Sequence, residues 1–295
     1  MRFPAALPSP ESAAWWLGPV PLRAYSVAIL LGIVVAILMT RYRLRARGGT
    51  GEEIYDVAPW AIVLGIIGGR LYHVVSSPWP YFGEGGDLMS ALRIWDGGLG
   101  IWGAVAVGAV GAYVGCQRHG HSFVDLADAL APGLLVAQAI GRWGNWFNNE
   151  LYGGPSDSAW AVTIHEWDQA AGEAVRDASG QAIVKGTFEP TFLYESMWCL
   201  AAAVVLVLLD RHVRFRRGQL IALYVVLYTV GRFFFELMRT DPAQLVLGQR
   251  INVWVSLVVL VGGLMLFVAR RRAEPRPLPS PELSRVAQPS ESGTV

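Results

Sequence analysis

Residues 22–40 read LRAYSVAILLGIVVAILMT, an apolar run with a single charge at Arg23. A bilayer core needs about 20 mainly apolar residues per helix, so this run is long enough to span it. Four arginines, at every second position from Arg41 to Arg47, follow directly. A cleaved signal peptide carries its positive charges before the apolar run, so we expect this run to remain as a spanning helix.

The rest of the chain repeats this composition. Of the 295 residues, 53% are hydrophobic and only 16% are charged, which is too apolar for an ordinary soluble domain. Six further stretches approach the length and apolar character of a span: residues 57–77, 97–116, 123–147, 191–209, 218–237 and 251–269. The sequence therefore predicts an all-α polytopic membrane protein with seven transmembrane helices in a lipid bilayer.

Charge and cysteine content exclude several classes of protein. A net charge of +1 argues against a nucleic-acid partner, which requires clustered basic residues on a water-facing surface. The two cysteines, Cys116 and Cys199, lie in apolar stretches without a CxxC motif, which argues against a disulfide framework and a structural zinc site. The five histidines show no metal-ligand spacing. We expect neither a metal nor a cofactor.

Basic residues in the short loops predict the direction of the spans. One side of the predicted membrane domain carries Arg41 to Arg47, Arg118, Arg211 to Arg217 and Arg270 to Arg272. Cytoplasmic loops carry an excess of arginine and lysine, so this side is expected to be cytoplasmic. The N-terminus is then outside and the C-terminus inside.

Two flanks and one loop complete the predicted organisation. Residues 1–21 include Trp15 and Trp16, and indoles prefer the membrane interface, so this segment is expected to lie at the outer surface. The seven-helix domain spans residues 22–272, and residues 273–295, rich in proline, serine and charge, are expected to be a disordered cytoplasmic tail. Residues 148–190 predict a small extracytoplasmic loop domain.

Alternating apolar and polar residues occur twice within that loop. They lie around Trp160 to Ile164 and around Gln181 to Phe188. Alternation with a period of two is typical of a strand that is half buried. The two stretches are therefore predicted to pair as a hairpin.

The polar residues of the predicted spans gather on the outer side. Charges within a span are costly and usually face the bundle interior or a wet cavity, so each one requires a reason. Residues three or four apart share one face of a helix, which predicts two polar stripes. One stripe contains Tyr228, Arg232, Glu236 and Arg239, and the other contains Gln138, Arg142, Asn145 and Asn149; Tyr25, Arg70, His73, Asp96, Glu150 and Glu195 lie at the same depth.

Two interpretations of these charges remain open for any one pair. In the first interpretation, Arg232 pairs with Glu236, or Arg70 with an acid, as an internal ion pair that fixes helix packing. However, three arginines in the outer halves of different helices exceed what packing requires, and the guanidinium fork suits a phosphate. We therefore favour a bound phosphate headgroup. For His73, a packing role is favoured over a chemical one.

Residues 141–153 read GRWGNWFNNELYG, which closely resembles the signature of bacterial prolipoprotein diacylglyceryl transferases. The resemblance covers nearly all seven predicted spans in order. It includes Tyr25, Gly69 with Arg70, Trp95 to Leu99, Pro190 to Glu195, and Gly231 with Arg232, Glu236 and Arg239.

The resemblance implies a multi-pass enzyme of the bacterial plasma (inner) membrane with its active site toward the outer side. It implies transfer of the diacylglyceryl group of phosphatidylglycerol to the lipobox cysteine in the signal peptide of a preprolipoprotein, with release of glycerol phosphate. Arg142, Arg232, Glu236 and Tyr25 would be catalytic, and Arg142, Asn145, Glu150, Gly153, Arg70, Arg239, Tyr228 and Asp96 would bind substrate. Within this set, Arg142 and Arg232 would bind the lipid phosphate and Glu236 would position Arg232.

One position departs from the family pattern. Many members carry a histidine in a His-Gly-Gly-Leu segment, where this chain has Trp102 followed by Gly-Ala-Val. The base that activates the cysteine is therefore not assigned, and His73, Glu236 and a phosphate oxygen of the substrate remain alternatives.

Two other functions fit an arginine-rich membrane protein. An anion transporter would often show internal repeats and a site near the midplane, whereas this chain shows no repeat and an off-centre cluster. A lipid-binding assembly module would bind phosphatidylglycerol without changing it. The signature favours the transferase over both.

Overall fold

The computed structural model describes residues 7–18, 20–94, 97–168, 171–241 and 243–275. The chain divides into two compact units, one made of the residues up to Met39 together with Leu130 to Arg276, and the other containing Thr40 to Ala129. Helices α1 (Ala24–Ala46) and α5 (Phe123–Phe147) each contribute residues to both units.

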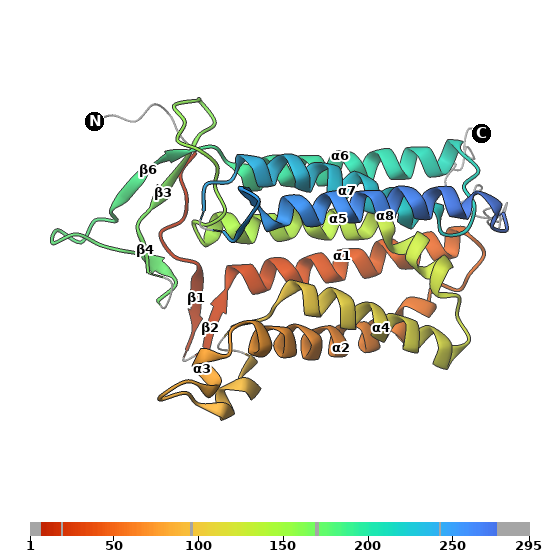
Figure 1. Cartoon of the computed structure of the whole chain (residues 1–295), viewed down its shortest axis with the longest axis horizontal. Helices are drawn as coiled ribbons and strands as arrows, with labels where there is room; N and C mark the ends of the chain where they lie inside the picture. Colours follow the sequence, from red (N-terminus) through yellow and green to blue (C-terminus); the bar gives the residue numbers. More distant parts are fainter. Residues whose placement is uncertain (1–6, 19, 95–96, 169–170, 242, 276–295) are drawn as a thin grey trace, which may run out of the picture. The chain divides into compact units, whose positions relative to one another are not determined.

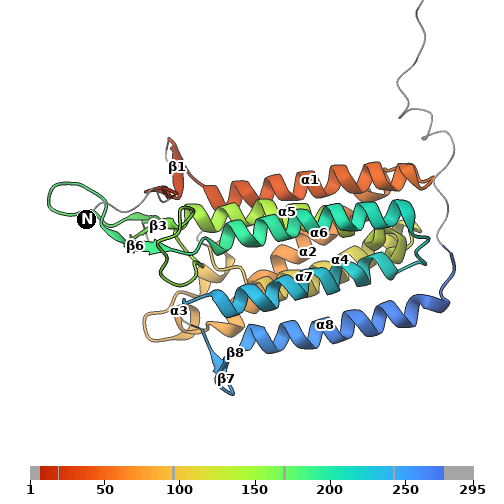
Figure 2. The same ribbon diagram turned by 90° about the horizontal axis from the view of Figure 1, so that it is seen from above.

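The first unit is a bundle of helices that run side by side (Figures 1 and 2). Besides α1 and α5 it contains α6 (Thr191–His212), α7 (Gln219–Met238) and α8 (Ile251–Ala269). Small side chains allow α5 and α6 to approach closely, because alanine fills little space between two backbones. The buried core combines Ala131, Leu135 and Ala139 of α5 with Cys199, Ala202, Ala203 and Leu206 of α6, and with Phe215 and Leu220.

The second unit is built on α2 (Glu53–Ser76) and α4 (Ile101–His119), which pack through glycines. A Cβ atom at Gly68 would overlap the side chain of Val107, and one at Gly103 would overlap the carbonyl of Gly68. Glycine is therefore required at these two contacts. A short helix α3 (Trp79–Phe82) and a 3-10 helix η1 (Leu88–Leu92) lie between α2 and α4 in the chain.

Within the described residues, six helices are long and apolar enough to cross a membrane: α1, α2, α5, α6, α7, and α8 with the 3-10 turn η3 (Arg270–Arg272). The remaining predicted span, 97–116, corresponds to α4, whose last turn carries Gln117, Arg118 and His119. This helix begins at Ile101 rather than at residue 97, because Gly97 and Gly98 have φ angles of +92° and +77°, which a right-handed helix excludes.

The loop after α5 contains the predicted pair of strands. β3 (Val162–His165) pairs antiparallel with β6 (Val184–Phe188), so the pairing predicted from alternation is confirmed. A smaller pair, β4 (Trp167–Asp168) and β5 (Glu173–Ala174), lies between them in the chain. These strands lie beyond the ends of α5 and α6 (Figure 1).

The N-terminal segment attaches to this loop. β1 (Ala14–Leu17) and β2 (Val20–Arg23) form a hairpin, with 53% of Trp15 and 69% of Trp16 exposed. The backbone N–H of Leu7 donates to Ala161 O at 2.7 Å. Another short hairpin, β7 (Leu245–Val246) and β8 (Gln249–Arg250), joins α7 to α8. Most of the predicted C-terminal tail, residues 276–295, lies outside the described residues.

Candidate active site

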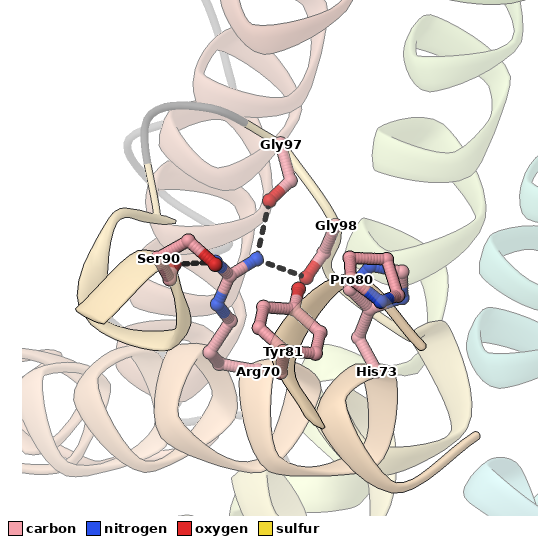
Figure 3. Close-up of a pocket in the computed structure, with 7 residues that line it drawn as sticks. All are labelled: Arg70, His73, Pro80, Tyr81, Ser90, Gly97 and Gly98. Atoms are coloured by element: carbon pink, nitrogen blue, oxygen red, sulfur yellow. Dashed lines mark hydrogen bonds between the residues drawn. The ribbon is translucent and has the colours of Figure 1, made fainter. Parts of the chain in front are cut away.

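Arg70 of the second unit binds backbone carbonyl groups. It lies in the last third of α2 and only 8% of it is exposed. Its Nε donates to Ala91 O at 2.8 Å, its Nη1 to Gly97 O at 2.6 Å and Gly98 O at 3.0 Å, and its Nη2 to Ser90 O and to Arg93 O at 3.1 Å. A guanidinium group has five N–H donors, so these bonds use all of them. Figure 3 shows the bonds to Ser90, Gly97 and Gly98. Arg70 therefore holds the loop between η1 and α4.

A cavity of about 170 Å³ lies beside Arg70, and the predicted residue His73 also lines it. The guanidinium carbon of Arg70 lies 5.3 Å from the ring centroid of Tyr81, whose ring contacts His73 edge-on. Figure 3 shows Arg70, Tyr81 and His73 around this space. The second unit thus brings Arg70 and His73 together, whereas Asp96 lies outside the described residues.

In the first unit, two predicted arginines converge on one carboxylate. Arg142 Nη2 lies 2.9 Å from Oε2 of Glu195, and Arg232 Nη1 lies 3.6 Å from the same oxygen. The three side chains come from α5, α7 and α6 respectively, and 16%, 18% and 5% of their surfaces are exposed. Among the described residues, Glu195 is the one acid within ion-pair distance of Arg142. The negative charge of Glu195 therefore offsets the repulsion between the two guanidinium groups.

Glu236 is the centre of a second group of ion pairs. Its Oε2 lies 2.7 Å from Arg232 Nη2 and 3.3 Å from Arg239 Nη1. Its Oε1 accepts from Arg250 Nε at 2.7 Å and from Asn252 Nδ2 at 3.3 Å. Glu236 is fully buried, so its charge is stable only because these donors surround it.

Asp241, just after α7, extends this network. It binds Arg239 through two bonds of 2.8 Å, Nε to Oδ1 and Nη2 to Oδ2, and Arg250 Nη2 lies 3.0 Å from Oδ2. Burial alone would raise the pKa of Asp241, but hydrogen bonds and the charges of Arg239 and Arg250 hold it below its ordinary value. The two arginines are therefore locked in place by two acids.

The end of the signature forms a turn held by side-chain amides. Asn145 Nδ2 and Asn148 Nδ2 both donate to Oε1 of Glu150, at 2.9 Å and 3.0 Å. The backbone turns sharply here, with Asn149 and Leu151 at φ angles of +51° and +58°. Asparagine tolerates this left-handed region better than most residues, whereas leucine does not. The predicted residues Asn145 and Glu150 are thus brought into direct contact.

Asn149 ties this turn to the N-terminal segment. Its Oδ1 accepts from Ser9 Oγ at 2.7 Å and from the backbone N–H of His165 at 3.1 Å, and its Nδ2 donates to Pro10 O at 2.8 Å. Ser9 Oγ also lies 3.2 Å from His165 Nδ1. Burial lowers the pKa of His165, although the charge of Glu11 acts in the opposite direction. Asn149 therefore has a structural role that its place on the polar stripe does not reveal.

Gly153 joins three segments at the end of the signature. Its N–H donates to Glu189 O at 2.9 Å, and its carbonyl accepts from Thr240 Oγ1 at 3.0 Å. A Cβ atom at this position would lie 2.9 Å from the Cβ of Glu189 and 3.2 Å from the carbonyl oxygen of Met238. The signature therefore requires glycine here because the backbones approach closely.

The two predicted tyrosines come from different helices of the first unit, and both lie near Arg142. Tyr25 is 40% exposed at the start of α1 and packs its ring over Gly144, where a side chain would collide with it. At Gly141, by contrast, no atom lies within 4 Å of a Cβ built on the backbone. Tyr228 lines a narrow pocket together with Glu195, Trp198, Cys199, Gly231, Arg232 and Phe235.

Three acidic or basic groups of this cluster are missing from the predicted site. Glu195 was recognised as a polar residue at the start of its helix, but its spacing gave no indication that it bridges Arg142 and Arg232. Asp241 follows α7 and Arg250 precedes α8, so neither lies on a helical face whose spacing indicates a partner. The signal that could have found this pair is the short segment between them. It forms a hairpin that brings the end of α7 close to the start of α8.

Comparison with known proteins identifies the family of this chain. The model of the family described as prolipoprotein diacylglyceryl transferase matches residues 12–269. Three relatives carry the name phosphatidylglycerol–prolipoprotein diacylglyceryl transferase. The protein of Paenarthrobacter aurescens is 54% identical over 90% of this chain and 83% of its own length, that of Frankia alni 51% over 92% and 69%, and that of Streptomyces griseus 45% over 97% and 84%. The chain belongs to the prolipoprotein diacylglyceryl transferase family.

Proposed function

We propose that this chain transfers the diacylglyceryl group of phosphatidylglycerol to the lipobox cysteine of a preprolipoprotein signal peptide. The products are a thioether and glycerol phosphate. The family and the names of the relatives support this reaction. The structural observation that carries it is the convergence of Arg142 and Arg232, from different helices, on a single carboxylate oxygen.

Arg142 and Arg232 are the proposed phosphate ligands. Each presents a planar set of N–H donors, and such groups bind phosphate oxygens with two parallel bonds. The carboxylate of Glu195 shows that an oxygen anion is stable between them. Each arginine keeps part of its side chain exposed, so a headgroup has access to it.

The transfer is a nucleophilic displacement at the terminal glyceryl carbon. The substrate thiol first loses its proton, and the thiolate electron pair then forms the C–S bond. The bond between this carbon and the phosphate oxygen breaks, and the oxygen keeps the electron pair. The base, either His73 or a phosphate oxygen of the substrate, takes the thiol proton, which ends on the released phosphate monoester or on water. Guanidinium groups fixed in advance stabilise the charge that develops on the departing phosphate.

The remaining residues of the cluster position these two arginines. Glu236 holds Arg232 at 2.7 Å and is itself held by Arg239 and Arg250. Because both oxygens of Glu236 are bound by arginines, we infer that it acts as an anchor and not as the base. Asn145, Glu150 and Gly153 shape the wall of the site, and Tyr25, Tyr228 and Asp96 are proposed to contact the lipid.

Arg70 and His73 have a different proposed role. The five donors of Arg70 are committed to backbone carbonyls, so its geometry supports holding a loop rather than binding a phosphate. His73 remains an alternative for the base because Trp102, the residue in place of the family histidine, has no proton-accepting group. A phosphate oxygen of the substrate is the other alternative.

The membrane orientation is part of this proposal. We infer seven spans, with α4 as the additional one, an outer N-terminus and a cytoplasmic C-terminus in the bacterial plasma membrane. The arginine-rich loops support that direction. The end of α5 and the start of α6, where Arg142 and Glu195 lie, would then face outward together with the loop of β3 and β6. This side is where a translocated signal peptide presents its cysteine.

The test is incubation of the purified protein in phosphatidylglycerol micelles with a synthetic lipobox peptide, followed by mass spectrometry. We expect a diacylglyceryl mass increment on the peptide, and none on a peptide with serine in place of the cysteine. Arg142→Ala should abolish the increment, while Arg214→Ala, a matched exposed arginine, should retain it. Lipid binding without any increment in folded wild-type protein would favour the lipid-binding module instead.

A further inference from the structure

Glu195 lies at the point where the substrate phosphate would bind. Only 4% of the residue is exposed, and one of its oxygens faces both Arg142 and Arg232. A buried carboxylate is costly unless cations compensate it. In return, its charge stabilises two guanidinium groups that would otherwise repel each other. Removing it therefore changes both the geometry and the charge of the phosphate subsite.

The ion-paired cluster around Glu195 carries one excess positive charge. Its members are four arginines, Arg142, Arg232, Arg239 and Arg250, and three carboxylates, Glu195, Glu236 and Asp241. Four positive charges against three negative charges leave a charge of +1. The count covers the ion-paired groups alone, because the described contacts of the Glu150 carboxylate are with the amides of Asn145 and Asn148. Within the ion-paired groups, the excess charge equals the single negative charge of a phosphodiester in magnitude.

The proposed reaction changes the charge of the phosphate. The headgroup of phosphatidylglycerol is a phosphodiester with one negative charge. When the bond to the diacylglyceryl carbon breaks, the product is a monoester whose second ionisation has a pKa near 6 and which carries about −1.5 to −2 at pH 7. Substrate and product thus differ in charge at the same place.

We propose that Glu195 is a positioning and specificity residue that holds Arg142 with Arg232 and matches the phosphate subsite to a singly charged phosphodiester. The doubly charged glycerol phosphate is then bound less tightly than a bare pair of arginines would bind it, and it leaves the site. The inference rests on the proposed function, because it assumes that the lipid phosphate binds between these arginines.

Wild-type protein gives the first test, through inhibition of transfer by glycerol phosphate between about pH 5.5 and 7.5, where the inhibitor gains its second charge. The groups that face Glu195 are Arg142 of α5, Arg232 and Tyr228 of α7, and Cys199 of its own helix. The second negative charge finds no further excess cation among the ion-paired groups and must lose its hydration on binding, so we expect the inhibition constant, relative to the KM for phosphatidylglycerol, to rise with pH. A ratio that falls or stays constant would overturn the proposal.

The second test compares Glu195→Gln with Asp241→Asn. Both remove one carboxylate from the cluster, but Asp241 contacts Arg239 and Arg250 rather than the proposed phosphate ligands. We expect Glu195→Gln to lower the ratio of the glycerol phosphate inhibition constant to KM by roughly tenfold, the effect of removing one nearby like charge. Asp241→Asn should lower that ratio less, because Arg239, Arg250 and Glu236 lie between Asp241 and the proposed phosphate ligands in the chain of ion pairs.

Each result decides a separate question. An unchanged ratio in folded Glu195→Gln protein, or an equal decrease in both variants, would overturn the role of Glu195. Absence of thioether formation by the wild type would instead contradict the proposed function. If Glu195→Gln does not fold, the pH series on the wild type still decides the matter, because it requires no substitution.

Discussion

Two buried arginine sites of this chain show two ways to stabilise the same cation. Arg70 in the second unit is bound by five backbone carbonyl groups and by the face of Tyr81, with no carboxylate among its described partners. Arg142 and Arg232 in the first unit are bound by Glu195 and Glu236. The backbone carbonyls use every donor of Arg70 and fix a loop. The carboxylates leave Arg142 and Arg232 partly available to another anion.

The two sites differ in how many N–H donors of the arginine remain for a ligand. All five donors of Arg70 are used, so a phosphate would have to displace part of the loop between η1 and α4. Arg142 makes one ion pair and keeps 16% of its side chain exposed. An arginine in the outer half of an apolar helix therefore indicates a buried polar site, but only its partners indicate whether that site binds substrate.

The largest expected effect is the loss of activity on substitution of Arg142, which is bound by a carboxylate. Arg142→Lys keeps the positive charge but replaces the planar fork with a single ammonium group, which cannot bind two phosphate oxygens in parallel. We expect kcat/KM for transfer to fall by about 100-fold or more, with little change in thermal unfolding. Initial rates at several lipid concentrations measure this, and a loss below about fivefold would contradict direct phosphate binding.

Substitution of Arg70, which is bound by neutral carbonyl groups, should lower stability more directly than it lowers activity. Arg70→Ala leaves the carbonyls of Ser90, Ala91, Arg93, Gly97 and Gly98 without their buried donor. We expect a decrease of about 2 to 4 kcal/mol in the free energy of unfolding, because unsatisfied buried polar groups are costly. The measurement is denaturant unfolding in detergent. Comparable stability to wild type, with activity lost, would instead place Arg70 in direct contact with substrate.

Much of the helical architecture could be predicted from the sequence. The range 123–147 matches α5 at both ends, and the predicted range 191–209 begins where α6 begins, because runs of apolar residues determine both. The start of α4 was misplaced by four residues, since Gly97 and Gly98 are compatible with an apolar span while their positive φ angles are not visible in composition.

The candidate site was predictable only along single helices. Spacing of three and four residues correctly placed Arg232, Glu236 and Arg239 on one face of α7 and its end. Contacts between helices do not follow from spacing, so Glu195 and Arg250 were left out although both hold predicted arginines. The roles of Asn149 and Gly153 depend on a turn and on a close backbone approach, which become visible only in three dimensions.

A smaller effect is expected from glycines within the signature. Gly153→Ala places a methyl group 2.9 Å from the Cβ of Glu189 and 3.2 Å from the carbonyl oxygen of Met238. We expect a destabilisation of about 1 to 3 kcal/mol, because this contact is tighter than ordinary packing and must push the loop away from the end of α7. Gly141→Ala is the matched control, since its methyl group meets no atom within 4 Å. Equal melting temperatures for both variants would contradict the prediction.

The smallest expected effect is a difference in acid sensitivity between two contact networks of the first unit. One joins Ser9, Asn149 and His165 by hydrogen bonds, and the other joins Asp241 to its arginines. Burial holds the folded pKa of His165 below its ordinary 6.5, so its contribution to stability is complete above pH 6.5 and is lost as the pH falls through the folded pKa. Arginine contacts hold the pKa of Asp241 below its ordinary 3.8, so its contribution is complete above pH 3.8 and is lost only at more acidic pH. The contacts of Ser9 and Asn149 with His165 should therefore weaken first.

Thermal unfolding between about pH 7 and 5 should reveal this order as a decrease in the melting temperature of the wild type. His165→Gln removes the titrating group, so the decrease in melting temperature over this window should become smaller. Asp241→Asn should leave the decrease unchanged, because Asp241 stays ionised throughout the window. If Asp241→Asn removed the acid sensitivity and His165→Gln did not, the arginine network would be the less acid-resistant of the two, contrary to its geometry.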